Sequence, residues 1–377
     1  MVKKIISFVF RVISNNRILS NVTNQSKDKS KVLVSYTTLP FYTRTNRHTN
    51  SQEIHAIAEI LHELGFRVDV VNYTCEKRIN YSDYKIIFGF GQPFENSFRA
   101  SNSPLIRIYY ATGAHVFHQN AAEAQRVTAV NTRYNTNLLP RRLVSWCWTL
   151  STNFCDHLII LGNSWTESTY KEYTNSKISM MNATALLNNL SNPKNRNISK
   201  NRMNFLWFGS SGLVHKGLDL CLIFFSEHPE LTLHICGPKE EDFFRVFEDY
   251  FRLPNIVFHG FVSVNSSVFL DISTKCVFAI LPSCSEGQAT ALLTAMGTGL
   301  IPVATRFTGI DVTKYGYLIE ALTVESIAAT VSVIEGESDE VLTVKSEKSA
   351  RYVNRNHTLR KFKKNMRKIL AEITNEE

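Results

Sequence analysis

One carboxylate next to a glycine is the most informative feature of this sequence. The stretch 281–299, LPSCSEGQATALLTAMGTG, is typical of a strand end, a short polar loop and a helix of small and apolar residues. Glu286 lies at the expected junction of loop and helix, and Gly287 follows it. Backbone N–H groups at a helix N-terminus bind phosphate, whereas a carboxylate accepts hydrogen bonds from hydroxyl groups. The stretch therefore predicts a pocket for a sugar linked to phosphate.

A glycine-rich turn earlier in the chain carries a basic residue. The apolar run 205–208 ends in the turn 209–212, which begins with Gly209, and Lys216 follows at the start of an expected helix. Glycine allows the backbone to approach a ligand closely, and a lysine at a helix start reaches a phosphate. A tight turn with an exposed lysine has the same pattern, so both interpretations stay open. Gly237 ends a later strand in a similar way.

The elements that must position these residues alternate between short apolar strands and amphipathic helices. Such alternation favours parallel sheets covered on both faces, with ligands bound beyond the carboxyl ends of the strands. We therefore predict an α/β fold of two doubly wound, Rossmann-like domains that face each other across a cleft. The expected strands are 32–36, 67–72, 85–90, 105–110 and 158–161 in the first half, and 205–208, 231–236, 256–258, 276–281, 301–303 and 317–319 in the second.

Helix boundaries carry local signals. Asn50 with Glu53, and Ser164 with Glu167, resemble capping boxes at two helix starts, and Gly65 is a typical helix stop. The run 186–203 is rich in Asn, Ser and Lys and predicts a linker. The expected segments are a basic N-terminal segment and tether (1–30), a first domain (31–185), the linker (186–203), a second domain (204–350) and a basic C-terminal helix (351–377).

Composition excludes several function classes. The chain has 377 residues, 44% of them hydrophobic, and no apolar run long enough to span a membrane as a helix. Its seven cysteines form no C-x-x-C pair, which fits a reducing cytoplasm and argues against a disulfide framework or a zinc site. The net charge is +9, but residues 1–31, 191–202 and 355–368 carry +6, +4 and +7, so the remainder carries −8. This distribution favours an anionic surface over nucleic acid as a partner.

Both basic ends have amphipathic patterns. Residues 1–20 place Ile, Phe and Val on one helical face and Lys, Arg and Ser on the other, as in a helix at an anionic membrane surface. A helix docked on the protein, or a frayed terminus, has the same pattern. The last helix, from about Thr358, has an apolar stripe and a basic opposite face, which favours a solvated face over lipid contact. The stripe consists of Leu359, Phe362, Met366, Ile369, Leu370 and Ile373.

The motifs of the second half occur in a known order. Over about residues 204–312 they resemble the nucleotide-sugar domain of retaining GT-B glycosyltransferases of the group 1 (family 4) type. The first half matches more loosely, through its opening strand, the helix ending at Gly65 and the turn Thr112-Gly-Ala-His115. The motifs are Gly209 with Lys216-Gly-Leu-Asp, Ile235-Cys-Gly237, Phe258-His-Gly260-Phe-Val, Pro282-Ser-x-Ser-Glu286-Gly287 and Ala295-Met-x-x-Gly299-x-x-Pro302-Val.

The resemblance implies a role for each matching position. Lys216 would contact the donor diphosphate, and Glu286 would hold hydroxyls of the transferred sugar. His115 would lie near the sugar and the acceptor, and with Glu286 and Lys216 it completes the expected catalytic set. The expected donor-binding residues also include Gly209, Ser210, Gly237, Gly287, Gln288 and Thr294. On the acceptor side we expect His115, with His48, Thr49 and Asn50 as weaker candidates and His118 as a weaker one still.

Two positions depart from the family pattern. Thr294 stands where the family has a second glutamate that holds the ribose, and one short hydroxyl cannot replace that grip. Ser210 stands where the family often has a basic residue, so one positive charge is missing from the diphosphate site. These departures keep a second hypothesis open, namely a non-catalytic binding subunit of the same fold with a weakened donor site.

The leading prediction is a cytoplasmic glycosyltransferase at the inner face of the membrane that builds a surface polysaccharide or glycolipid. Its partners would be a nucleotide-sugar donor and a glycan or lipid-linked acceptor, with no nucleic acid. No D-x-D loop is evident, so we expect no metal and no cofactor beyond the co-substrate. Retention, as the resemblance implies, would proceed by attack on the face that the leaving phosphate departs from.

Overall fold

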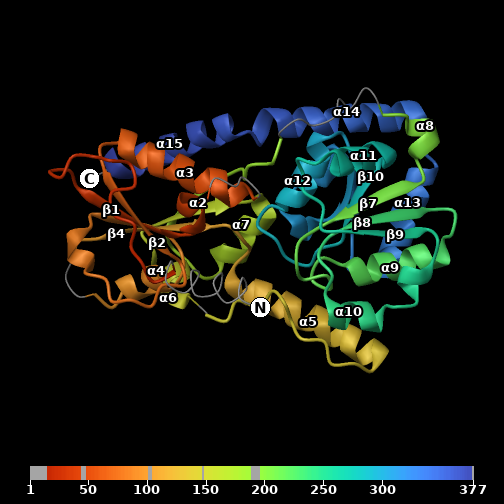
Figure 1. Ribbon diagram of the computed structural model, residues 1–377, viewed down its shortest axis with the longest axis horizontal. Coiled ribbons are helices and arrows are strands. Elements are labelled where there is room, and N and C mark those ends of the chain that lie inside the picture. The colour runs from red at the N-terminus through yellow and green to blue at the C-terminus, as the bar shows by residue number, and fades with distance from the viewer. Residues whose placement is uncertain (1–14, 44–47, 101–103, 147, 188–195, 376–377) are drawn as a thin grey trace.

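The computed structural model describes residues 15–43, 48–100, 104–146, 148–187 and 196–375. Two domains lie side by side along the long axis of the molecule (Figure 1). The membrane-surface helix expected within residues 1–20 falls mostly outside the described residues. Within the described part of the chain, no helix combines the length and the apolar character needed to cross a membrane.

The N-terminal domain is built on a parallel sheet with strand order β2-β1-β3-β4-β5-β6. The chain runs outward from β1 to β2 and then crosses back to β3, so its carboxyl edge has a switch point between β1 and β3. The strands are β1 (Lys31–Tyr36), β2 (Arg67–Asn72), β3 (Ile86–Gly89), β4 (Ile106–Ala111), β5 (His157–Leu161) and β6 (Lys177–Met181). The helices are α2 (Leu39–Tyr42), α3 (Thr49–Glu63), α4 (Gln92–Ser97), α5 (Val116–Tyr134), α6 (Thr149–Phe154) and α7 (Ser164–Lys171).

The C-terminal domain repeats this plan with strand order β12-β11-β10-β7-β8-β9, and its switch point lies between β7 and β10. The two sheets confirm the predicted fold of doubly wound α/β domains. The strands are β7 (Asn204–Phe208), β8 (Thr232–Cys236), β9 (Ile256–Gly260), β10 (Phe278–Leu281), β11 (Ile301–Thr305) and β12 (Tyr317–Ile319). The helices are α8 (Ile198–Asn201), α9 (Leu218–Glu227), α10 (Glu241–Val246), α11 (Ser267–Lys275), α12 (Thr290–Gly297), α13 (Val324–Glu335), α14 (Asp339–Asn356) and α15 (Leu359–Asn375).

The last two helices run along one side of both domains (Figure 1). After α14 packs on the C-terminal domain, α15 returns to the N-terminal domain and packs on α3. The predicted stripe is buried at Phe362, Met366, Ile369, Leu370 and Ile373. Part of the basic face is ion-paired with α3, through Lys363 to Glu59 and Arg367 to Glu63.

Helix α5 joins the domains on the opposite side, where it extends from the N-terminal domain past α10 (Figure 1). Its last residue, Tyr134, contacts the Phe247 ring and shares a 3.1 Å hydrogen bond with the Tyr250 hydroxyl. Several side chains of this helix that contact the other domain are charged, among them Glu123 and Arg126. Helix α5 therefore carries residues that hold the two domains together beside the cleft.

Three local expectations differ from the structure. His48 rather than Asn50 caps α3, by accepting a hydrogen bond from the Asn50 amide. Asn163 rather than Ser164 caps α7, because its amide oxygen accepts from the Trp165 and Thr166 amides.

The tether expected at residues 21–30 is held at its start: Leu19 pairs with Val70 on β2, and the Gln25 side chain bonds the His62 carbonyl. The stop at Gly65 is confirmed by its φ of +90°.

Candidate active site

A cavity of about 710 Å³ lies between the two domains. It is lined by residues that follow the carboxyl ends of strands on both sheets, such as Thr37 after β1, Gly209 after β7 and Gly237 after β8. Thr37 and Gly209 flank the switch points of the two sheets, where ligands of doubly wound folds bind. The cleft is therefore the candidate active site.

The ion pair of Lys216 and Glu286 lies in this cleft. The two side chains are only 7% and 11% exposed, and the Ser283 hydroxyl donates a 3.1 Å hydrogen bond to the same carboxylate oxygen. Burial alone would raise the pKa of Glu286, but the charges of Lys216, Arg142 and His215 lower it to about 2. The carboxylate is thus ionised at neutral pH and can accept hydrogen bonds from ligand hydroxyls.

Glycine brings the loops of this pair together. Gly217 has a φ of +68°, and a Cβ at this position would lie 2.3 Å from the Pro282 carbonyl oxygen. The loop after β7 can therefore contact the loop after β10 only with glycine here. Glu286 lies in that second loop, four residues before α12 begins, and its amide donates to the Phe307 carbonyl. The expected position of Glu286 at the helix start is therefore corrected to a loop held by the segment after β11.

The other expected donor residues divide into two groups. Gly209, Ser210 and Gly237 line the cleft beside Lys216. Gly287 does not line it: a Cβ there would lie 2.5 Å from the Thr112 carbonyl oxygen, so Gly287 forms a close contact between the domains. Its own carbonyl accepts a 2.9 Å hydrogen bond from the Thr166 hydroxyl of the N-terminal domain.

Gln288 and Thr294 line the cleft, but their polar groups already hold the segment that leaves the N-terminal domain. The Gln288 side-chain oxygen accepts from the Ala183 amide at 2.8 Å. The Thr294 hydroxyl accepts from the Leu186 amide at 3.2 Å and donates to the Thr290 carbonyl. Both side chains thus position the connection between the domains.

On the opposite wall, His48 and Asn50 line the cleft at the N-terminus of α3, with Thr49 between them. Burial lowers the pKa of His48, and the nearby charges of Arg142 and Lys216 lower it further. His48 is therefore neutral at pH 7, with Nδ1 used as the acceptor for the Asn50 amide at 3.3 Å.

His115 is not among the residues that line the cleft. Its ring is buried, with Nδ1 accepting from the Phe117 amide and Nε2 lying 3.2 Å from the Asn153 side-chain oxygen. The ring also stacks on Tyr173 at 4.4 Å. His118 packs on Trp165 and is also absent from the cleft lining. Thr112, the first residue after β4, faces the cleft instead.

Sequence reasoning missed the loop before α6. Arg142, Trp146 and Trp148 from this loop line the cleft, together with Tyr73 and Phe90 from other loops. The signal was present, since two adjacent arginines followed by two tryptophans are unusual for a bland connecting loop.

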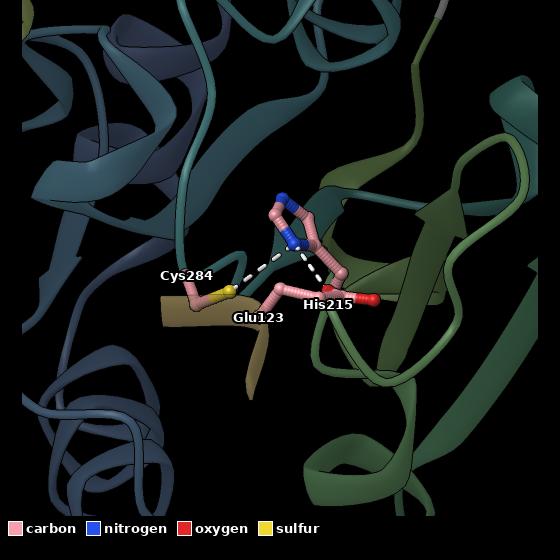
Figure 2. Close-up of side chains that lie close together, drawn as sticks. All are labelled: Glu123, His215 and Cys284. Atoms are coloured by element: carbon pink, nitrogen blue, oxygen red, sulfur yellow. Dashed lines mark hydrogen bonds and ion pairs between the residues drawn. The ribbon is translucent and has the colours of Figure 1, made fainter. Parts of the chain in front are cut away.

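Glu123, His215 and Cys284 form a buried cluster (Figure 2). His215 Nδ1 lies 2.7 Å from a Glu123 carboxylate oxygen and 3.4 Å from the Cys284 sulfur. Burial raises the pKa of Cys284 to about 12, so the thiol is neutral at pH 7. Although these three residue types can ligate a metal, the 2.7 Å separation is that of a direct hydrogen bond between histidine and carboxylate.

Comparison with known proteins finds a family for the C-terminal domain. Residues 203–334 match the family of group 1 glycosyl transferases. The C-terminal domain is thus similar to group 1 glycosyl transferases over most of its length. No curated protein sequence matches this chain.

Solved glycosyltransferase structures share the fold of this chain. Sucrose-phosphate synthase from Thermosynechococcus elongatus has a TM-score of 0.66 at 12% identity, covering 93% of this chain and 100% of that one. Anabaena HepE, solved with UDP and glucose, has a TM-score of 0.58 at 13% identity, covering 91% and 100%. WaaG, a glycosyltransferase involved in lipopolysaccharide biosynthesis, has a TM-score of 0.56 at 13% identity, covering 89% and 98%. These likenesses establish the GT-B fold over both domains.

Proposed function

We propose that the chain transfers a sugar, with retention, from a nucleotide-sugar donor to a glycan or lipid-linked acceptor in the interdomain cleft. The observation that carries the proposal is the Lys216–Glu286 ion pair, which is nearly buried yet lines the cavity. A donor offers both parts of this pair a better partner, since its diphosphate attracts the ammonium and its sugar hydroxyls donate to the carboxylate.

The proposed reaction exchanges one bond at the anomeric carbon for another. The bond from this carbon to the diphosphate oxygen breaks, while a bond to the acceptor oxygen forms on the same face. The departing phosphate oxygen takes the acceptor proton. Lys216 stabilises the negative charge that develops on the leaving diphosphate, and closure of the two domains around the donor excludes water.

The acceptor is proposed to bind along an aromatic wall of the N-terminal domain. Phe90 is the centre of this wall, with ring contacts to Tyr36 at 5.2 Å, Tyr73 at 5.3 Å and Trp148 at 5.8 Å. Trp146 extends the wall through Trp148, and all five rings line the cleft. Flat apolar ring faces with a few polar groups nearby suit the faces of sugar rings.

Nucleoside diphosphate release from a panel of nucleotide sugars tests the donor site. The wild-type protein should turn over at least one donor, while Glu286→Gln and Lys216→Gln should each lose at least about tenfold in kcat/KM. Asp271→Asn and Lys275→Gln remove an exposed ion pair of α11 and are the matched controls. Equal rates for wild type and both site variants would disprove the site assignment, and donor binding without any transfer would favour the binding-subunit hypothesis.

Two further experiments test the acceptor site and the independence from metal. Trp146→Ala should lower kcat/KM for the acceptor while the donor KM is unchanged, whereas Phe154→Ala, an exposed aromatic outside the cleft, should change neither. Transfer should persist in a chelator, because protein cations are proposed to carry the diphosphate charge. A loss of transfer that Mg²⁺ restores would contradict this.

Membrane attachment is proposed from the amphipathic pattern of residues 1–20. Deletion of these residues should reduce co-sedimentation with vesicles that contain anionic lipid, and should have little effect with neutral vesicles. Unchanged sedimentation with anionic vesicles would exclude the attachment. Reduced sedimentation would place the enzyme where a lipid-linked acceptor is found.

A further inference from the structure

Arg142 extends from the N-terminal domain across the cleft onto the glycine-rich turn of the C-terminal domain. A Cβ on Gly212 would lie 2.4 Å from Arg142 Cγ, so the stem of the arginine passes directly over this turn. Gly212 also has a φ of +93°, which favours glycine. The turn thus accepts a side chain from the other domain in close contact.

Arg142 lines the cavity, and no residue that the structure describes bonds or ion-pairs with its guanidinium. Its Nε is buried and makes no hydrogen bond. A buried donor without an acceptor is costly, so a ligand that supplies an acceptor is favoured at this point. The charge of Arg142 acts on both Glu286 and His48, which places it within the electrostatic field of the Lys216 site.

The backbone of Arg142 is held by α5. Its amide donates to a Glu123 carboxylate oxygen at 2.9 Å, and its carbonyl accepts from the Gln119 side chain at 2.9 Å. The Arg141 amide donates to the same Glu123 oxygen at 2.7 Å. Glu123 therefore fixes the loop from which Arg142 extends.

The second oxygen of Glu123 holds the C-terminal domain at the residue before Lys216. His215 Nδ1 lies 2.7 Å from this oxygen, and His215 Nε2 lies 2.5 Å from the Ser285 carbonyl (Figure 2). A carbonyl can only accept, so Nε2 carries a proton. Burial would raise the pKa of Glu123, but its hydrogen bonds to His215, Arg142 and Arg141 lower it, so the carboxylate is ionised and Nδ1 donates to it.

Ser210 also lines the cleft, and it stands where the family pattern often has a basic residue. One positive charge is therefore missing from the C-terminal domain, while one unpartnered positive charge arrives from the N-terminal domain. A single buried carboxylate, that of Glu123, bonds the Arg142 amide and the ring of His215, the residue before Lys216. An arginine offers a planar set of donors that suits two phosphate oxygens at once.

We propose that Arg142 binds the diphosphate of the donor from the N-terminal domain, opposite Lys216, and that the Glu123–His215 pair positions the two cations. This inference rests on the proposed function and names a ligand for its donor site. It makes the diphosphate a bridge between the domains, so that donor binding holds the cleft in its closed arrangement.

Calorimetric titration with UDP, GDP and ADP, each paired with its monophosphate, tests the inference. For a diphosphate that binds, Arg142→Gln should weaken binding by about 10- to 100-fold, because a charge-assisted contact is lost. Binding of the monophosphate should change much less, and Arg142→Lys should recover part of the loss. Arg245→Gln, an exposed residue of α10 outside the cleft, is the matched control.

The possible outcomes separate the inference from the function on which it rests. If the wild type binds none of the diphosphates and turns over no donor, the proposed function fails and the inference falls with it. If the wild type binds a diphosphate and Arg142→Gln binds it equally well, only the inference fails. An equal loss for diphosphate and monophosphate would also overturn it, because the contact would not be with the terminal phosphate.

The positioning role has its own readout. Glu123→Gln leaves one acceptor oxygen where two now serve the Arg141 and Arg142 amides and His215 Nδ1, so the link between this loop and His215 is weakened. In this background Arg142→Gln should cause a clearly smaller loss of diphosphate affinity than in the wild type, because Arg142 is held less firmly opposite Lys216. Additive losses would show a merely structural role for Glu123. If Glu123→Gln fails to fold, as judged by circular dichroism, the Arg142 variants alone decide the proposal.

Discussion

Arg126 on α5 and Asp219 on α9 form an ion pair across the domain interface, with Nη2 2.6 Å from the carboxylate and both side chains nearly inaccessible. One Asp219 oxygen has no hydrogen-bond partner. Burial raises the pKa of Asp219, and the charge of Arg126 only partly opposes this rise. The interface therefore contains a buried carboxylate whose charged form is stabilised by a single cation from the other domain.

Removing that cation should be costly and pH-dependent. Arg126→Met should destabilise the protein by about 3–5 kcal/mol at pH 7.5, because it leaves Asp219 charged and buried without a partner. A carboxyl group with a raised folded-state pKa destabilises the fold above that pKa, and protonation relieves this as pH falls. The deficit should therefore be smaller at pH 5 in urea unfolding, and Arg126→Met/Asp219→Leu should recover most of it. A deficit independent of pH would contradict this account.

The pH dependence that Glu286 gives to stability has the opposite sign to that of Asp219. Its folded-state pKa of about 2 lies below the ordinary value of 4.5, so its contribution is present above pH 4.5 and is lost as pH falls toward 2. Between pH 5 and pH 3 the wild type should lose on the order of 2 kcal/mol more unfolding free energy than Glu286→Gln. Only this difference in slope is diagnostic, since Glu286→Gln also leaves Lys216 unpaired. Parallel pH profiles would show that the carboxylate is not held as the structure describes.

Gly287 sets the distance between the domains. A Cβ at Gly287 would lie 2.5 Å from the Thr112 carbonyl oxygen, whereas a Cβ at the neighbouring Gly113 would have no atom within 4 Å. Gly287→Ala should cost about 1–3 kcal/mol in stability and lower kcat, because the domains must separate locally. Gly113→Ala is the matched control and should retain activity. Urea unfolding and donor turnover measure the two effects, and a neutral Gly287→Ala would show that the contact yields easily.

Thr294 should act on the connection between the domains more than on the nucleotide. Thr294→Val removes the acceptor of the Leu186 amide and should cost about 1–3 kcal/mol, while Thr294→Ser should be close to neutral. Nucleoside diphosphate affinity should change less than about twofold in either variant. A large loss of affinity with unchanged stability would instead make Thr294 a ribose ligand, as its sequence position suggests.

The sequence predicts the fold well because most strands are short apolar runs buried on both faces, such as Val32 to Tyr36. It fails at β6, an edge strand whose residues Lys177 to Met180 are at most half-buried and carry little apolar signal. Lys216, Gly209 and Glu286 were also predictable, because each follows a recognisable strand and their loops meet at one edge of the sheet.

The rest of the site depends on contacts between distant segments. Nothing near Glu123 in the sequence indicates that its carboxylate joins Arg142 to His215, which lie 19 and 92 residues away. His115 failed to reach the cleft for a similar reason: it caps α5 and stacks on Tyr173, a residue of another element. Local pattern fixes which residues end a strand, but three-dimensional packing decides which of them face the cavity.

Helix α15 should stabilise the protein through its apolar stripe and not through its ion pairs. Leu370 is fully buried against the N-terminal domain, so Leu370→Ala should cost about 2–5 kcal/mol in unfolding free energy. Lys363→Gln and Arg367→Gln remove exposed pairs with Glu59 and Glu63 and should each cost less than about 1 kcal/mol. Urea unfolding at low and high salt separates the two effects, because salt screens only the pairs. A larger cost for the charge variants at low salt would mean that electrostatic attraction, and not burial, holds the chain end on α3.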